Sequence, residues 1–534
     1  MRKIRSFSSS ELIVLVSLFV ALFGNATFFS NAFKTYTFTS QNILFLGSLL
    51  IFLIITIILI LSLLCHYRLI KPVLIVFLLI SAATAYFMDQ YGAIIDSAVV
   101  TSMTKTDTRE LLDLFSLKMV AYIFFLGLLP SMLIYKIKLN YPGHIKETIS
   151  RLKLSFVTLA LGGFIFFSLW SHYASFFRIH QDISSYANPV FSFYSVGKLV
   201  HKALISVPMP FKTVGADATL QETDIDRELV IMVVGETARA DHFSLNGYHR
   251  ETNPKLKQRN VINFPNVWSC GTLTIDSVPC MFSNLTRASF GRREAKNQDN
   301  VLDILQRSGI NVLWRDNNSS SKGVADRVLY QSFLTKETNP VCDVECRDEG
   351  MLSGLQEYIN QHPEGDIMIV LHQMGNHGPA YYKRYPRVFE KFTPVCKTNE
   401  LSACTSEEIS NTYDNAILYT DHFLSRVIDF LKQNDRGFET AMVYMSDHGE
   451  SLGDKGIYLH GLPYVIAPDE QKHVPAVMWF GKNYEDEVLA NLESRRKQKL
   501  SHDNLFSTLL GMFEIKSKEY NPSMDILDHS HENQ

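Results

Sequence analysis

Residues 229–236 read Leu-Val-Ile-Met-Val-Val-Gly-Glu, an apolar run rich in β-branched residues that ends in a glycine and an acid. Such a run is typical of a buried strand. Similar short apolar runs alternate with helical stretches along the rest of the chain. The apolar runs are Ile310–Trp314, Ile367–Leu371, Thr440–Met445 and Val474–Phe480. The helical stretches are Asn300–Arg307, Met351–Asn360, Glu407–Lys432 and Asp503–Phe513. This alternation predicts a mainly parallel sheet with helices on both faces.

Polar side chains follow the ends of these predicted strands repeatedly. Open α/β sheets form their binding crevices at the carboxyl ends of their strands. We therefore expect five of these residues to converge on one site: Glu236, Asn318, His377, Asp447 and His448.

The first part of the chain has a different character, because it is dominated by long apolar runs. Five of them approach the ~20 residues that a membrane-spanning helix needs: Leu12–Phe33, Ile43–Cys65, Ile70–Met88, Leu117–Ile137 and Leu154–Tyr173. The first run is not a signal peptide, since no small-residue cleavage site follows it. We expect a five-span transmembrane domain at 1–176, an interfacial helix and linker at 177–227, and an α/β domain at 228–534.

Charge and cysteines place the α/β domain outside the cytoplasm. Lysines and arginines precede the first span and lie between the second and third and between the fourth and fifth, which assigns those loops to the cytoplasm. Six of the seven cysteines form close pairs along the sequence, Cys270/Cys280, Cys342/Cys346 and Cys396/Cys404. Paired cysteines indicate disulfides in an oxidising compartment, and a zinc knuckle is the alternative. The net charge of −3 gives no sign of a nucleic-acid partner.

Two features of the second half suggest chemistry. Residues 270–283 place two cysteines, two threonines and two serines ahead of a helix-like segment, an arrangement that suits a nucleophile or a disulfide-closed surface loop. The residues alone do not choose between Thr272, Thr274 and Ser277. The other feature is the set of Glu236, Asp447 and His448. With an open fourth position these residues form a catalytic zinc set, although manganese or magnesium would also fit. The adjacent Asp447 and His448 can reach one ion only across a sharp turn, which Gly449 would permit.

Three motifs together resemble the lipid A phosphoethanolamine transferases, a family that includes the mobile colistin-resistance enzymes and has the alkaline phosphatase/sulfatase fold. The motifs are Gly235–Arg239, the Cys-Gly-Thr-Leu-Thr run ending at Thr274, and Ser446–Ser451. The resemblance covers nearly the whole chain. It implies that Thr274 is the nucleophile and the fourth ligand of a zinc ion, although the Ile275-Asp276 that follows is less typical of the family.

The resemblance also implies roles for other residues. Asn318 and Lys322 would bind phosphate, and His377 and His460 would protonate the leaving group or bind a second zinc ion. In the loop after the third span, three residues at helical spacing would contact the lipid donor's head group: Ser102, Thr106 and Glu110, the first standing where the family has asparagine.

The function implied is metal-dependent transfer of phosphoethanolamine from phosphatidylethanolamine to a lipid A phosphate through a phosphothreonine, which lowers polymyxin and colistin susceptibility. We expect a monomer in the inner membrane, among membrane lipids, with its catalytic domain in the periplasm. The alternatives are a sulfatase-like hydrolase, a transferase of glycerol phosphate or with another acceptor, and a membrane sensor. The sensor is disfavoured, because it needs no hydroxyl, carboxylates and imidazoles at one point.

Overall fold

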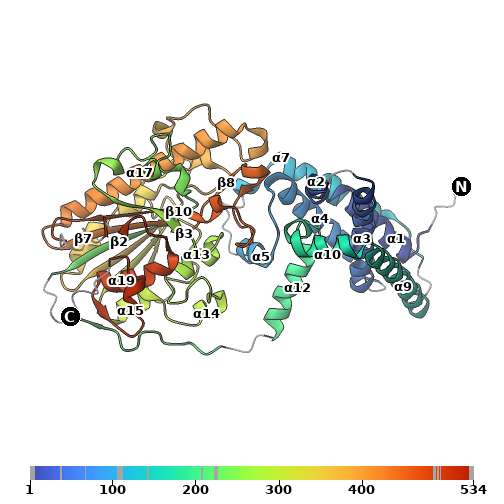
Figure 1. The fold of residues 1–534 in the computed structure, drawn as a ribbon, viewed down its shortest axis with the longest axis horizontal. Helices are drawn as coiled ribbons and strands as arrows, with labels where there is room; N and C mark the ends of the chain where they lie inside the picture. Colours follow the sequence, from blue (N-terminus) through green and yellow to red (C-terminus); the bar gives the residue numbers. More distant parts are fainter. Residues whose placement is uncertain are drawn as a thin grey trace. The chain divides into compact units, whose positions relative to one another are not determined.

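The computed structural model describes residues 6–36, 39–65, 68–104, 112–140, 143–205, 209–221, 226–484, 489, 492–493 and 495–527 (Figure 1). The chain divides into two compact units. One comprises Met1–Thr104 and Phe115–Ser206, and the other comprises Lys105–Leu114 and Val207–Gln534.

The second unit is built on an eight-stranded sheet with the order β11-β3-β10-β7-β2-β6-β4-β5. Only β10 runs against its neighbours, so the predicted mainly parallel sheet is confirmed. The strands are β2 (Glu228–Gly235), β3 (Ile262–Trp268), β4 (Asn311–Asp316), β5 (Leu329–Ser332), β6 (Ile367–His372), β7 (Glu439–Ser446), β10 (His473–Phe480) and β11 (Leu500–Ser501). Sequence reasoning missed β3, β5 and β11, which lack a continuous buried apolar run.

Alternate side chains of β2 enter two separate cores, as strand geometry requires. Val230, Met232 and Val234 face one core, and their neighbours face the other. The first core is closed by α13 (Thr274–Met281), α15 (Val301–Arg307) and α19 (Leu505–Met512), and the second by α16 (Leu355–Gln361) and α17 (Ser406–Asn434) (Figure 1). The sheet is therefore covered on both faces, as its apolar strands predict.

Shorter elements complete this unit. The antiparallel pair β1 (Thr219–Leu220) and β12 (Ile515–Lys516) joins the start of the domain to its end. The small hairpin of β8 (Ser451–Leu452) and β9 (Tyr458–Leu459) follows β7, and α14 (Arg292–Lys296) follows α13. The predicted helix Met351–Asn360 is interrupted at Gly354, whose φ of 72° is left-handed and which caps the start of α16.

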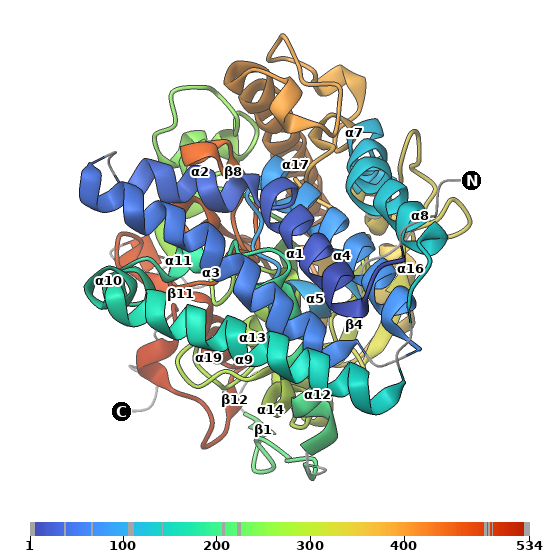
Figure 2. The same ribbon diagram turned by 90° about the vertical axis from the view of Figure 1, so that its right-hand side faces the viewer.

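The first unit is helical. Its long elements are α3 (Ser40–Leu64), α4 (Ile70–Tyr91) and α9 (His144–Ser168), and its shorter ones are α1 (Ser9–Phe23), α2 (Ala26–Thr35), α5 (Ser97–Met103), α7 (Leu117–Tyr122), a π-helical segment (Ile123–Leu128), α8 (Leu129–Lys136), α10 (Trp170–Ile179), α11 (Gln181–Ser184) and α12 (Val190–Ile205). α3 packs against α1 and α9 (Figure 2). Within the described residues, four helical stretches are long and apolar enough to cross a membrane, and the bent pair α1–α2 makes a fifth span if it counts as one.

The first predicted span is not a continuous helix, because α1 and α2 meet at 57°. The break falls at Gly24 and Asn25, and a buried asparagine pair satisfies the backbone there. The Asn25 amide donates to the Asn188 carbonyl at 2.9 Å, and Asn188 donates its backbone N–H to Asn25 at 2.8 Å and its side-chain amide to Gly24 O at 2.8 Å. Broken helices in membranes need such partners for their freed backbone groups. Hydropathy averaged over the run does not reveal the break, since the apolar residues on both sides outweigh Gly24 and Asn25.

Candidate active site

Three ligand-type side chains come together where β2 and β7 end. These neighbouring parallel strands are in register at Gly235 and Ser446, so the residues that follow leave the sheet at the same edge. Ligand atoms of Glu236, Asp447 and His448 lie within 4.8 Å of one another, and all three residues are fully buried.

The charges of this trio fit a bound cation. His448 donates Nδ1–H to Gly449 O at 2.9 Å, which leaves the lone pair of Nε2 towards Glu236 Oε1 at 3.6 Å and Asp447 Oδ2 at 3.4 Å. Burial lowers the pKa of His448, so the ring is neutral beside two carboxylates. Asp447 Oδ2 is buried and lacks a hydrogen-bond partner among the described residues. A buried carboxylate oxygen in that state is costly unless a cation compensates it, and two carboxylates with one imidazole suit zinc.

Thr274 stands directly beside this trio. Its Oγ lies 3.4 and 3.2 Å from the two Glu236 carboxylate oxygens and 3.3 Å from His448 Nε2. It is also the first residue of α13, where unpaired N–H groups and a partial positive charge favour an anion. Thr272 instead donates to Leu462 O at 2.6 Å, and Ser277 accepts from Gly271 N at 3.0 Å. Of the three hydroxyls that the sequence left open, Thr274 is the one at the trio.

Covalent and ionic contacts hold the Thr274 helix. The structure pairs the six cysteines as three disulfides, of which Cys270–Cys280 closes the loop before α13 with a Cα–Cα distance of 6.2 Å. Asp276, the less typical acid beside the nucleophile, is paired with Arg292, whose Nη2 lies 2.7 Å from Asp276 Oδ2. The acid therefore adds little unbalanced charge near Thr274.

Backbone close to the ligands is unusual in two places. Thr237, directly after Glu236, has a left-handed φ of 51°, a strained state for a β-branched residue that is found most often at functional sites. Gly449 does not make the expected sharp turn with a left-handed φ. It is required because a Cβ there would lie 2.0 Å from the carbonyl oxygen of Glu470, which passes alongside and accepts from Glu450 N at 2.9 Å.

Two further histidines extend the site from His448. The ring centroid of His460 lies 4.3 Å from that of His448, and the ring centroid of His377 lies 5.5 Å from that of His460. Burial, with the nearby His460, lowers the pKa of His377 well below its usual value. Its Nδ1 is buried without a hydrogen-bond partner among the described residues, which leaves an imidazole nitrogen free for a ligand or a proton.

Glu450 is a site residue to which sequence reasoning gave no role. It is fully buried, and its Oε2 lies 3.2 Å from Nδ1 of His460. Burial raises its pKa well above the usual value, which favours the protonated form of the carboxyl. The signal was its position in the Ser446–Ser451 motif, two residues after His448.

Asn318 and Lys322 lie on the loop after β4. The Asn318 amide donates to Glu236 Oε2 at 2.7 Å and to Gln373 O at 2.8 Å, so it orients the carboxylate of the trio. Lys322 donates to the Ser319 hydroxyl, and its charge is one of the weaker causes that lower the pKa of His377. Both predicted residues are thus at the same edge of the sheet.

The three residues predicted to contact the donor's head group are only partly described. Ser102 lies in the last turn of α5, which ends at Met103. Thr106 and Glu110 lie outside the described residues. Their role stays a prediction.

His502 links the two sides of the site and carried no sequence signal. This fully buried residue accepts from Cys270 N at Nδ1, at 3.0 Å, and donates from Nε2 to Ser446 O, at 2.9 Å. It thereby joins the start of the disulfide loop to the end of β7. Its position near the end of the chain, far from both partners in sequence, gave no reason to single it out.

Comparisons with known proteins identify the class that this fold and site define. Residues 228–515 match the family model described as Sulfatase, and residues 53–204 match the model described as Phosphoethanolamine transferase EptA/EptB. The chain is 43% identical over 524 residues to Phosphatidylethanolamine transferase Mcr-1 of Escherichia coli, covering 96% of each chain. The chain belongs to the phosphoethanolamine transferase family.

Solved structures agree with this assignment. The integral membrane protein lipooligosaccharide phosphoethanolamine transferase A (EptA) from Neisseria meningitidis matches with a TM-score of 0.93 and 35% identity, covering 98% of this chain and 99% of that chain. The C-terminal periplasmic domain of phosphoethanolamine transferase EptC from Campylobacter jejuni matches with a TM-score of 0.54 and 44% identity, covering 60% of this chain and 98% of that chain. The chain is accordingly a multi-pass membrane enzyme whose α/β catalytic domain lies in the periplasm.

Proposed function

We propose that the chain transfers phosphoethanolamine from phosphatidylethanolamine to a phosphate of lipid A through a covalent phosphothreonine at Thr274. The observation that carries this proposal is the convergence of Thr274 Oγ on Glu236 and His448, with distances of 3.2 to 3.4 Å. The names of the Escherichia coli and Neisseria relatives, which contain phosphatidylethanolamine and lipooligosaccharide, support the two substrates.

The reaction is a double displacement. In the first step Thr274 Oγ gives its proton to water and bonds to the phosphorus of phosphatidylethanolamine, while the bond from phosphorus to the diacylglycerol oxygen breaks and its electron pair leaves with that oxygen, which takes up a proton. In the second step an oxygen of the lipid A phosphate attacks the same phosphorus. The bond to Oγ then breaks, its electron pair returns to Oγ, and a proton restores the threonine hydroxyl.

Residues of the trio would hold the metal. A zinc ion held by Glu236, Asp447, His448 and Thr274 Oγ would supply the positive charge that lowers the pKa of the threonine hydroxyl. Asn318 keeps the Glu236 carboxylate in place, and Lys322 supplies a positive charge for a phosphoryl oxygen. The ion count is part of the proposal, with one zinc expected and a second near His377 and His460 as the alternative.

A proton for the departing diacylglycerol oxygen is available at His460. The Glu450 carboxyl, whose pKa is raised by burial, faces its Nδ1 at 3.2 Å, so that His460 would donate from Nε2 and recover a proton at Nδ1 from Glu450. His377, with its unpaired Nδ1, is the second candidate for this transfer. General acids in such positions typically contribute about 10²–10⁴-fold in rate.

The remaining predictions belong to the same proposal. Ser102, Thr106 and Glu110 would contact the donor's head group. The divisions 1–176, 177–227 and 228–534 would be the membrane anchor, the interfacial segment and the catalytic domain of a monomer. The added ammonium would offset phosphate charge on lipid A, so cationic polymyxins, colistin among them, would bind less well.

Mass spectrometry of lipid A from cells that express the chain tests the proposal. We expect a phosphoethanolamine addition with the wild type and with Thr274→Ser, and none with Thr274→Ala. Proteolytic peptides containing Thr274 should also carry phosphoethanolamine when the acceptor is withheld. Unmodified lipid A with released phosphoethanolamine would identify a hydrolase. The absence of any turnover with metal present would favour the alternative of a non-enzymatic membrane sensor.

A further inference from the structure

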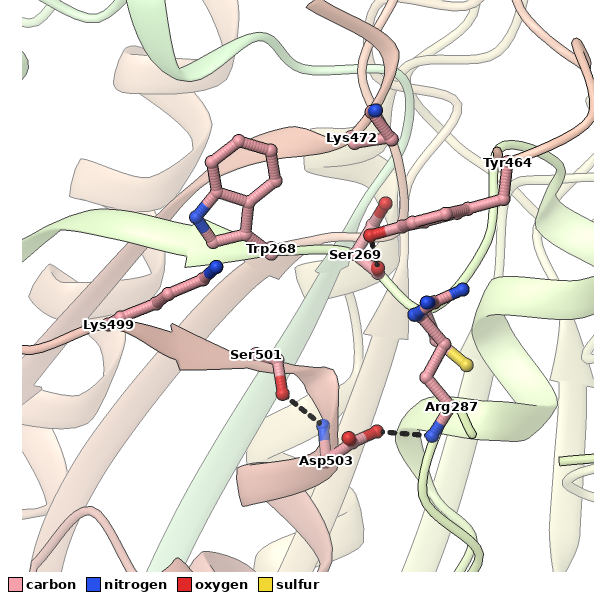
Figure 3. A pocket seen from close by; sticks show the side chains of 9 residues that line it. Trp268, Ser269, Arg287, Tyr464, Lys472, Lys499, Ser501 and Asp503 are labelled. Carbon is pink, nitrogen blue, oxygen red and sulfur yellow. Dashed lines mark hydrogen bonds between the residues drawn. The ribbon is translucent and has the colours of Figure 1, made fainter. Parts of the chain in front are cut away.

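A pocket of about 340 Å³ opens beside the loop that carries the nucleophile (Figure 3). Trp268 at the end of β3, Cys270, Tyr464 and Lys499 are among its lining residues. Its size is that of a small-ligand site, and nothing in the proposed chemistry at Thr274 uses it.

Three cations line this pocket, Arg287, Lys472 and Lys499, against one acid, Asp503. Lys472 pairs with the exposed Asp469 at 3.2 Å. Among the residues that the structure describes, neither the Arg287 guanidinium nor the Lys499 ammonium forms a salt bridge, although Asp503 accepts from the Arg287 backbone N–H at 2.8 Å and its carboxylate attracts the Arg287 charge. The pocket therefore has an excess of positive charge.

Aromatic faces also order these cations, of which Lys472 is already paired with Asp469 whereas Arg287 and Lys499 lie outside the salt bridges of the described residues. Arg287 lies 4.0 Å and Lys472 5.4 Å from the ring centroid of Tyr464, and Lys499 lies 5.1 Å from a ring of Trp268 (Figure 3). A cation held over an aromatic ring keeps its N–H donors for another partner, whereas a salt bridge would occupy them. Pre-ordered, unneutralised donors of this kind suit a phosphate group.

The pocket is built from the same loops as the reacting centre. Cys270 precedes Thr274 by four residues, so their Cα atoms lie within about 15 Å of each other, and its disulfide fixes it to α13. Tyr464 follows His460 by four residues and donates its hydroxyl to Ser269 O at 2.9 Å. A ligand in this pocket would therefore be within reach of Thr274 on a molecule that extends to both places.

We propose that this pocket is an acceptor subsite, which binds a phosphate monoester of the acceptor glycolipid other than the phosphate that is modified. Arg287 and Lys499 act as specificity-determining residues and favour acceptors with two phosphates. This inference rests on the proposed transfer to a phosphorylated glycolipid, and it adds how the acceptor is recognised.

Acceptors with one or two phosphates separate this role from general charge effects. The full-length enzyme, purified with its metal in detergent, is supplied with phosphatidylethanolamine and either bisphosphorylated or monophosphorylated lipid A. Loss of one charge-assisted hydrogen bond should raise the KM for the bisphosphorylated acceptor about tenfold in Arg287→Ala and in Lys499→Ala. The KM for the monophosphorylated acceptor and both kcat values should stay within about twofold of wild type.

Lys482→Ala is the matched control, because Lys482 is an exposed lysine that is not among the pocket's lining residues. It should leave both KM values unchanged. Arg287 and Lys499 are exposed as well, so truncating them should not unfold the domain. Equal KM changes for both acceptors, no change for either, or the same effect in Lys482→Ala would overturn the subsite.

A binding measurement keeps the subsite separate from the proposed function. If the wild type modifies neither acceptor, the transfer proposal fails, and binding is then followed by the quenching of tryptophan fluorescence. The subsite predicts that bisphosphorylated lipid A binds the wild type about tenfold more tightly than it binds Lys499→Ala. Equal binding to both proteins would overturn it, as would inorganic phosphate that binds as tightly as the glycolipid.

Discussion

The two sides of the active site are held in place by different means. Glu236 and Asp447 follow neighbouring strands whose backbone register fixes them together. Thr274, opposite them, stands on an eight-residue helix that depends on a disulfide and on His502. The sheet thus positions Glu236 and Asp447, whereas long-range contacts position Thr274. Substitution of a carboxylate on the first side should abolish transfer, and substitutions that loosen the second side should reduce the transfer rate in part.

The largest effect is expected for Asp447→Asn. The substitution keeps the shape of the side chain and removes one of the two buried carboxylate charges, so the trio should lose its metal. Transfer should fall by about 10³-fold or more, the range seen when a principal electrostatic group is removed from an active site. Metal content by elemental mass spectrometry and transfer rates on the purified protein measure both losses.

Stability provides the control for Asp447→Asn. Asp447 Oδ2 has no hydrogen-bond partner among the described residues, so the new amide breaks no hydrogen bond. Without metal, the variant should unfold at the same temperature as the wild type or higher, because a buried charge is gone. A metal-free variant that unfolds earlier would show that this carboxylate has a structural role instead.

His502→Leu tests the contact that joins the two sides. It leaves Cys270 N–H and Ser446 C=O buried without partners, at a cost of about 1–3 kcal/mol each. Displacement of the disulfide loop should lower kcat by about 10²-fold, as small misplacements of reacting groups do, with KM little changed. His502→Gln keeps an acceptor and a donor and should restore much of kcat. Equal losses in both variants would argue against positioning.

The same residue should make the fold sensitive to acid. Burial lowers the pKa of His502 from 6.5 to about 4, so the unfolded chain binds more protons between these values. The contribution of neutral His502 to the free energy of unfolding is therefore fully present above pH 6.5. It is lost as the pH falls towards 4, by about 3 kcal/mol. Thermal unfolding in detergent should show the advantage of the wild type over His502→Gln shrinking across that range.

This division also explains what could be read from the sequence. Apolar runs that end in polar residues predicted β2, β6 and β7, and with them the meeting of Glu236 and Asp447, because each run marks locally where its strand ends and parallel strands end at one edge of the sheet. His502 could not be predicted, since nothing near it in the chain records which backbone groups it will satisfy. Glu450 was visible in a motif, but its raised pKa follows from burial, which only the fold supplies.

The membrane half shows the same limit. Hydropathy predicted the spans, because length and composition alone decide whether a helix can cross a bilayer. It missed the bend at Gly24, which depends on Asn188, distant in sequence. The apolar pattern predicts the helices, whereas the polar contacts that bend them involve residues distant in the chain.

Removal of a disulfide beside Thr274 should lower kcat by an intermediate amount, and removal of a second disulfide elsewhere should not. Cys270–Cys280 and Cys396–Cys404 close loops of similar length, with sequence separations of 10 and 8. Replacing either pair with serines should therefore cost a similar free energy of unfolding, about 3 kcal/mol. Loss of the first bridge should also lower kcat about tenfold, since it loosens the Thr274 loop.

The second bridge is the matched control for the first. Its loss should leave kcat unchanged at temperatures where the protein stays folded, as circular dichroism would verify. Equal kcat losses for the two pairs would show that the Cys270–Cys280 bridge acts on activity only through stability.

The smallest effect is expected for Arg292→Ala, which leaves the charge of Asp276 unpaired two residues from Thr274. Both side chains are about one quarter exposed, so solvent screens the freed charge and the effect on phosphate approach should be only a few-fold in rate. The double variant Arg292→Ala/Asp276→Asn should recover the wild-type rate, because the pair contributes by neutralisation. Transfer rates at low and high salt distinguish this from a structural effect: salt should reduce the deficit of the single variant, whereas a displaced helix would be slow at every ionic strength. A rate loss as large as that of His502→Leu would mean that Arg292 positions the nucleophile and does more than balance its neighbour.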